Sequence, residues 1–136
     1  MTPLAKWTVV AVCLTALAAL VPWSRYGQVD VELSRLPLWW LYLGAAVLLH
    51  ACALLPARSG FVPGFVVGTA VLTTAALVAF GYDEASWPPP GAVDAGGFPV
   101  AVPMVAPRPG PGVLFAVASV VAQVVGLRAR ARLPVG

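Results

Sequence analysis

Four long apolar runs, separated by polar or proline-rich stretches, dominate the hydropathy pattern of the chain. They cover residues 4–21, 38–55, 62–80 and 111–130. A helix needs about 20 apolar residues to cross the hydrocarbon core of a bilayer, so these runs have the length of membrane spans. The pattern predicts an all-α membrane protein, a four-transmembrane-helix bundle in which all 136 residues form a single domain.

The first run, 4–21, has a second interpretation. Ala16-Leu17-Ala18 has the small-x-small form of a cleavage site after a short apolar region, so the run could be a cleaved signal peptide. Because the apolar residues continue past this site to Val21, we favour an uncleaved span.

The two polar loops, 22–37 and 81–110, are predicted to form a small extracytoplasmic cap. Residues 28–33 alternate between polar and apolar, which is typical of a short, half-buried strand. A helical turn that begins at Asp30 is the alternative, because Leu33 and Leu36 are three residues apart. The second loop is rich in proline and glycine, which leaves at most an edge strand or extended segment at 98–105.

The distribution of charge predicts the orientation. With four spans, one side of the membrane holds most of the basic residues, namely Lys6, Arg58, Arg128, Arg130 and Arg132. Cytoplasmic loops carry an excess of lysine and arginine, so both termini are predicted to lie in the cytoplasm. All acidic residues then fall in the outer loops. The chain is thus expected to be a multi-pass protein of the cell membrane.

Composition narrows the possible classes of protein. With 60% hydrophobic and 10% charged residues, the chain could not cover a soluble globule with polar surface. Its partners should include the lipid bilayer. No nucleic-acid partner is expected, because the basic residues do not form a patch interleaved with aromatic residues. The abundance of alanine, valine and arginine, without isoleucine, is typical of a GC-rich bacterial genome.

Tryptophans are predicted to anchor the protein at the membrane interfaces, where their rings lie at the level of the lipid headgroups. The predicted anchors are Trp7, Trp23, Trp39, Trp40 and Trp87. Ligand stacking is the alternative role for this aromatic cluster.

Small residues at helical spacing predict the sites of helix packing. Glycines recur every four residues in the third run, which lets another helix approach closely. In the fourth run, a serine and a glutamine four residues apart share a face and can hydrogen-bond to another helix, beside a stripe of small residues. The predicted packing residues are Gly60, Gly64, Gly68, Ala118, Ser119, Ala122 and Gln123. Their partner helix could belong to a second protein or to the same bundle.

Few residues point to catalysis. No apolar run holds an acid, which argues against coupled transport of the kind that small multidrug exporters perform. Cys13 and Cys52 are predicted at different depths, too far apart for a disulfide. His50 is the only histidine, and a hydrogen-bonded packing role is favoured because no further ligands for haem or zinc lie at its depth. We expect no cofactor and no metal site.

The sequence favours a non-enzymatic function. We expect an accessory or scaffolding subunit that packs against a larger membrane-protein partner, or a homo-oligomer, through its small-residue stripes. A small transporter or channel is the alternative. A membrane enzyme that handles a lipid or quinone is the second alternative.

Overall fold

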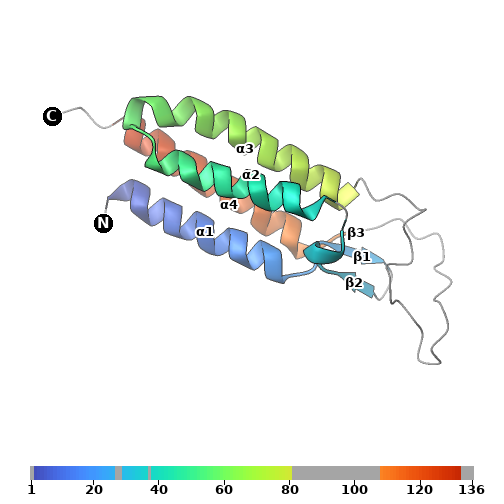
Figure 1. The fold of residues 1–136 in the computed structure, drawn as a ribbon. Coiled ribbons are helices and arrows are strands. Elements are labelled where there is room, and N and C mark those ends of the chain that lie inside the picture. Colours follow the sequence, from blue (N-terminus) through green and yellow to red (C-terminus); the bar gives the residue numbers. More distant parts are fainter. Residues whose placement is uncertain (1, 27–28, 37, 81–107, 133–136) are drawn as a thin grey trace, which may run out of the picture.

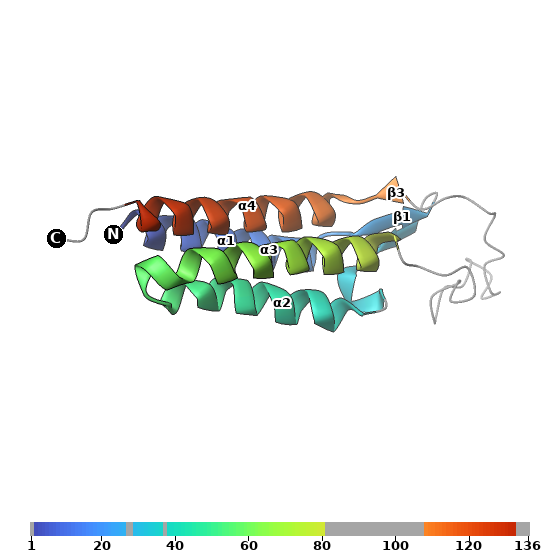
Figure 2. The same cartoon turned by 90° about the horizontal axis from the view of Figure 1, so that it is seen from above.

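The computed structural model describes residues 2–26, 29–36, 38–80 and 108–132. Most of them belong to four helices: α1 (Pro3–Leu20), α2 (Trp39–Ala51), α3 (Ala57–Phe80) and α4 (Pro111–Ala131). The helices lie side by side along one axis, with a small sheet at one end (Figure 1 and Figure 2). We name this the sheet end. The opposite end, where α1 begins and α4 ends, is the terminal end.

Helix boundaries follow from local chemistry. Thr2 caps α1 by accepting a hydrogen bond from the Ala5 amide at 3.3 Å, and Pro3 occupies the first turn, where no amide hydrogen is needed. α4 also begins with a proline, Pro111. α2 continues into a 3-10 helix, η2 (Cys52–Leu54), and Arg130 donates to the Ala53 and Leu55 carbonyl oxygens at 2.9 and 3.0 Å. This arginine therefore ties the end of α4 to the end of the α2–η2 stretch.

Three helical segments, Pro3–Leu20, Gly60–Phe80 and Pro111–Ala131, are long and apolar enough to cross a membrane. The second predicted span is shorter, with an apolar helical stretch of Trp39–Leu54. It begins after Leu38, whose φ of 61° lies in the left-handed region and cannot continue a right-handed helix. The four predicted helices are thus confirmed, the second in a shorter form.

α4 is the central helix of the bundle. α1 packs mainly on α4, and α3 packs on both α4 and α2, whereas α1 and α2 touch less. The buried residues of α1 are Leu4, Ala11 and Ala18, which recur every seven residues along one narrow face. Since two of the three are alanines, the backbones of α1 and α4 can lie close together.

A three-stranded antiparallel sheet closes the sheet end in the order β2-β1-β3. Its strands are β1 (Ser24–Tyr26), β2 (Val29–Val31) and β3 (Arg108–Pro109). Opposed residues Arg25 and Asp30 form an ion pair at 2.7 Å. The predicted strand is confirmed over Val29–Val31, and the alternative helical turn follows it as the 3-10 helix η1 (Leu33–Arg35). β1 and β3 were not expected from the sequence, and the predicted segment 98–105 lies outside the described residues.

Trp23 occupies the core beneath this sheet. Its ring is fully buried, donates from Nε1 to the Ala18 carbonyl oxygen at 2.6 Å, and packs edge-on against Tyr42 with ring centroids 4.7 Å apart. Gly112 is required here, because a side chain at that position would overlap the Trp23 ring. We predicted Trp23 as an interfacial anchor, but the structure places it inside the protein, where sheet, α1, α2 and α4 meet.

Candidate functional site: packing faces and a core polar cluster

The glycine stripe of α3 faces the interior of the bundle. A side chain at Gly64 would overlap Leu127 of α4, and one at Gly68 would lie 3.2 Å from Val120. At Gly60 the nearest atom would be the Cys52 carbonyl oxygen, at 3.1 Å. The α3 glycines therefore pack against helices of the same bundle rather than against a second protein. This stripe is filled by α4 and η2 and presents no surface to a second protein.

The small-residue stripe of α4 is only partly internal. Ala122 is buried, whereas Ala118 is exposed. Gly126 lies against α1, since a side chain there would come within 2.6 Å of Trp7 Cβ. The adjacent polar pair, Ser119 and Gln123, is buried and hydrogen-bonds to other helices. α4 thus uses this side to hold α1 and α2.

Buried and half-buried polar side chains from three helices meet in the middle of the bundle. We name them the core polar cluster: Thr8 and Thr15 of α1, His50 of α2, and Ser119 and Gln123 of α4. Thr15 Oγ1 lies 3.0 Å from His50 Nε2 and 2.6 Å from Ser119 Oγ. His50 Nδ1 lies 3.2 Å from Gln123 Oε1. His50 therefore bridges α2 to both α1 and α4.

The ends of the cluster are also bonded. Ser119 Oγ donates to the Ala11 carbonyl oxygen at 2.9 Å, and Gln123 Nε2 donates to Thr8 Oγ1 at 3.3 Å. A polar group removed from water costs free energy unless it finds such partners. Sequence reasoning identified the polar residues of α2 and α4, but it missed both threonines of α1. Thr8 and Thr15 are seven residues apart, as are Ala11 and Ala18. This common spacing could have shown that all four lie on one side of α1.

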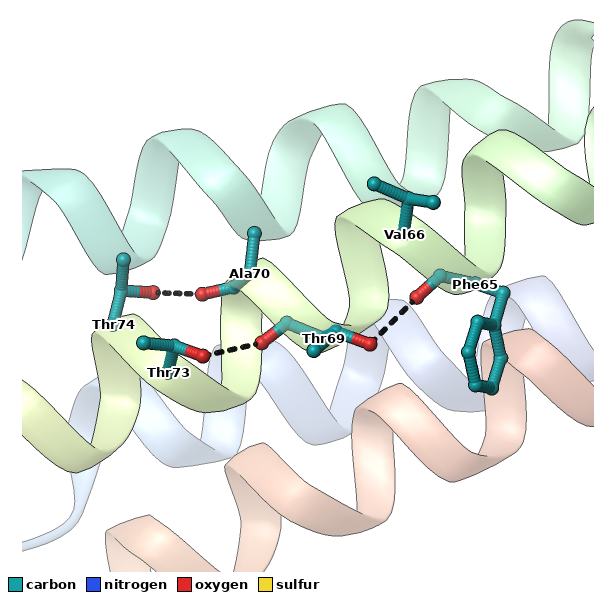
Figure 3. Close-up of a pocket in the computed structure, with 6 residues that line it drawn as sticks. All are labelled: Phe65, Val66, Thr69, Ala70, Thr73 and Thr74. Carbon is teal, nitrogen blue, oxygen red and sulfur yellow. Dashed lines mark hydrogen bonds between the residues drawn. The ribbon is translucent and has the colours of Figure 1, made fainter.

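A shallow hollow lies on the exposed surface of α3. It is largely open, has a volume of about 420 Å³, and is lined by six residues of this one helix (Figure 3): Phe65, Val66, Thr69, Ala70, Thr73 and Thr74. Threonine hydroxyls in this α3 hollow donate to carbonyl oxygens four residues earlier, for example Thr69 to Phe65 at 3.1 Å and Thr73 to Thr69 at 2.9 Å. The hollow therefore offers small, largely apolar contact surface without a free hydroxyl donor at these positions.

Three of the predicted anchors are exposed at the ends of the bundle. Trp7 is 40% exposed near the terminal end, and Trp39 and Trp40 are 38% and 58% exposed near the sheet end. These positions suit rings that contact the two membrane interfaces. Trp87 lies outside the described residues.

Groups that could hold a metal or transfer electrons do not come together in the part of the chain that the structure describes. No three His, Cys, Asp or Glu residues are clustered there. Cys13 is exposed on α1 and Cys52 is buried, and both thiols are free. Comparison with models of known families, with curated proteins and with solved structures found no match to this chain.

Proposed function

We propose that this chain is a non-enzymatic accessory or scaffolding subunit of a larger membrane complex, and that it docks through the α3 hollow. The hollow is the observation that carries the proposal. It lies in the central part of α3, away from both helix ends, where in a bilayer only lipid tails or another membrane helix would reach it. The occupant that we infer is an apolar transmembrane helix of the partner.

The side chains of the hollow suit this occupant. Ala70, Thr69 and Thr73 have short side chains, and the apolar side chains of Phe65 and Val66 beside them are 59% and 62% exposed. Close helix approach over small residues is how membrane helices associate when no hydrophobic drive exists between them. Because the threonine hydroxyls already bond within α3, docking an apolar helix would leave none of these donors without a partner.

The proposal includes four membrane spans with the terminal end in the cytoplasm. Lys6, Arg128, Arg130 and Arg132 belong to the terminal end. Fewer basic residues, Arg25, Arg35 and Arg108, belong to the sheet end, together with the acidic Asp30 and Glu32. This division supports a cytoplasmic terminal end through the positive-inside rule. α2 and η2 together form the shortest helical stretch. They span the bilayer because the bilayer can become thinner around a short span.

Site-directed crosslinking tests the docking surface. A photoreactive residue in place of Ala70, in native membranes, should give a discrete adduct with one membrane protein. The matched control is Val47, which is 65% exposed on α2 and outside the hollow, and should give only diffuse lipid adducts. In addition, Ala70→Phe fills the hollow and should abolish co-purification of the crosslinked partner. Equal adduct patterns from both positions would refute the docking surface.

A small transporter or channel is the second candidate, and the core polar cluster is the observation that favours it. Polar side chains in the middle of a membrane bundle are a usual mark of ion or proton pathways. Proton or ion flux into proteoliposomes that contain the purified protein would support this candidate. Flux no greater than that of protein-free liposomes would remove it.

A further inference from the structure

The core polar cluster determines where the hydrogen of the neutral His50 ring lies. An amide oxygen can only accept hydrogen bonds, and Gln123 Oε1 is the atom that faces His50 Nδ1, at 3.2 Å. With the Gln123 amide in this orientation, Nδ1 carries the hydrogen. Nε2 of the neutral ring is then a bare acceptor, and the Thr15 hydroxyl, at 3.0 Å, donates to it. In this state the Ser119 hydroxyl donates to Thr15 Oγ1 across 2.6 Å instead of to the Ala11 carbonyl oxygen.

The same contacts also suit a ring that carries a hydrogen on both nitrogens. Nε2–H then donates to Thr15 Oγ1. The Thr15 hydroxyl donates to Ser119 Oγ or to the Ala11 carbonyl oxygen, which lies 3.1 Å away, and Ser119 donates to the Ala11 carbonyl oxygen at 2.9 Å. Only the hydrogens of the Thr15 and Ser119 hydroxyls change direction, by rotation about the C–O bonds, and no heavy atom has to move. Gln123 Oε1 accepts from Nδ1–H in both states. Every hydrogen bond of the ring is thus kept when a proton is added.

The surroundings limit what else could interact with this proton. No hydrogen bond or ion pair joins His50 to another ionisable side chain among the described residues. Arg130 of α4 is engaged by the Ala53 and Leu55 carbonyl oxygens. The other ionisable groups of the packed helices are Lys6, Cys13, Tyr42, Cys52, Arg58, Arg128 and Arg132. On the Nδ1 side of the ring, the Gln123 amide cannot pass a proton on, because an amide does not readily release its hydrogens.

We propose that His50 is a proton-binding site in the core of the bundle: the neutral ring carries hydrogen on Nδ1, and Nε2 binds one proton from water as the Thr15 and Ser119 hydroxyls reverse. The bound ligand is a single proton, so charge increases by one and no bond between heavy atoms changes. Since His50 is the bridge from α2 to α1 and α4, the proton is sensed where three helices join. This inference is independent of the α3 hollow.

Nitrogen NMR of the full chain in lipid nanodiscs tests the proposal directly. His50 is the only histidine, so selective ¹⁵N-histidine labelling gives the signals of one ring. At high pH we expect the Nδ1–H tautomer. On titration from about pH 9 to about pH 4 we expect conversion to the doubly protonated ring, with the helical circular dichroism retained. An Nε2–H tautomer at high pH, or a ring that stays neutral throughout, would overturn the proposal.

Variants test the role of the hydroxyls. Thr15→Val removes the acceptor of Nε2–H, and a charge-assisted bond is stronger than a neutral one, so proton affinity should fall about tenfold, or about one pH unit. Thr15→Ser retains the hydroxyl and should keep the wild-type midpoint. Thr69→Val is the matched control, because its hydroxyl bonds only within α3. Equal midpoints in Thr15→Val and Thr69→Val would contradict the hydroxyl reversal.

Discussion

At the scale of single residues, Tyr42 carries a buried hydroxyl for which the described part of the chain offers no hydrogen-bond partner. A buried donor without a partner costs about 1–3 kcal/mol. We therefore expect Tyr42→Phe to leave the fold intact and to raise the free energy of unfolding by about 1 kcal/mol. Unfolding of the purified protein in detergent, followed by circular dichroism during denaturant titration, measures this change. A loss of stability would show that the hydroxyl has a partner such as an ordered water.

The neighbouring residue supplies the comparison for this measurement. Trp23 packs edge-on against Tyr42, and its indole hydrogen bonds to Ala18. Trp23→Phe removes that bond and leaves a cavity, so it should lower the free energy of unfolding, by about 2 kcal/mol or more. If Tyr42→Phe raises the free energy of unfolding and Trp23→Phe lowers it, the Tyr42 hydroxyl is destabilising. If both substitutions lower it, this part of the core tolerates no change.

At the scale of helices, the α1–α4 contact depends on Gly126. A methyl group there would come within 2.6 Å of Trp7 Cβ, which cannot move unless the α1 backbone moves with it. Gly126→Ala should therefore separate the two helices and lower the free energy of unfolding by about 1–3 kcal/mol. The same denaturant titration measures this effect.

Gly44→Ala is the matched control. Nothing lies within 4 Å of the methyl group it would add, so only helix propensity changes. It should be neutral or stabilise the protein by up to about 1 kcal/mol. Similar losses in Gly44→Ala and Gly126→Ala would mean that close approach of α1 is not what requires Gly126.

Some elements could be predicted from the sequence and others could not. The helices could be predicted because the length of an apolar run is a local property of the chain. The direction of the α3 glycines was not, because the pattern does not say which helices are neighbours, and α4 fills that stripe from far along the sequence. β1 and β3 are strands of two or three residues whose partners are distant in sequence, so they leave little periodic signal. For the same reason Thr15, the partner of His50 on α1, was missed.

At the scale of the whole molecule, the proposed orientation can be tested by cysteine labelling. In a Cys13→Ala, Cys52→Ala background, Ser34→Cys should react with an impermeant thiol reagent added to intact cells, since Ser34 is exposed at the sheet end. Ala131→Cys, exposed at the terminal end, should react only after the cells are permeabilised. The reverse pattern would invert the orientation of the protein in the membrane.

Because α1 packs mainly on α4, the first helix is made long before the helix that it contacts most. The ribosome makes roughly 5–20 residues per second, so on the order of 5 to 20 seconds separate the completion of α1 at Leu20 from the appearance of α4 at Pro111. During that interval the Ser119 partner of Thr15 and the Gln123 partner of Thr8 have not yet been made. A nascent chain is thus least protected just before its last helix emerges. A chain truncated before Pro111 would lack these contacts permanently.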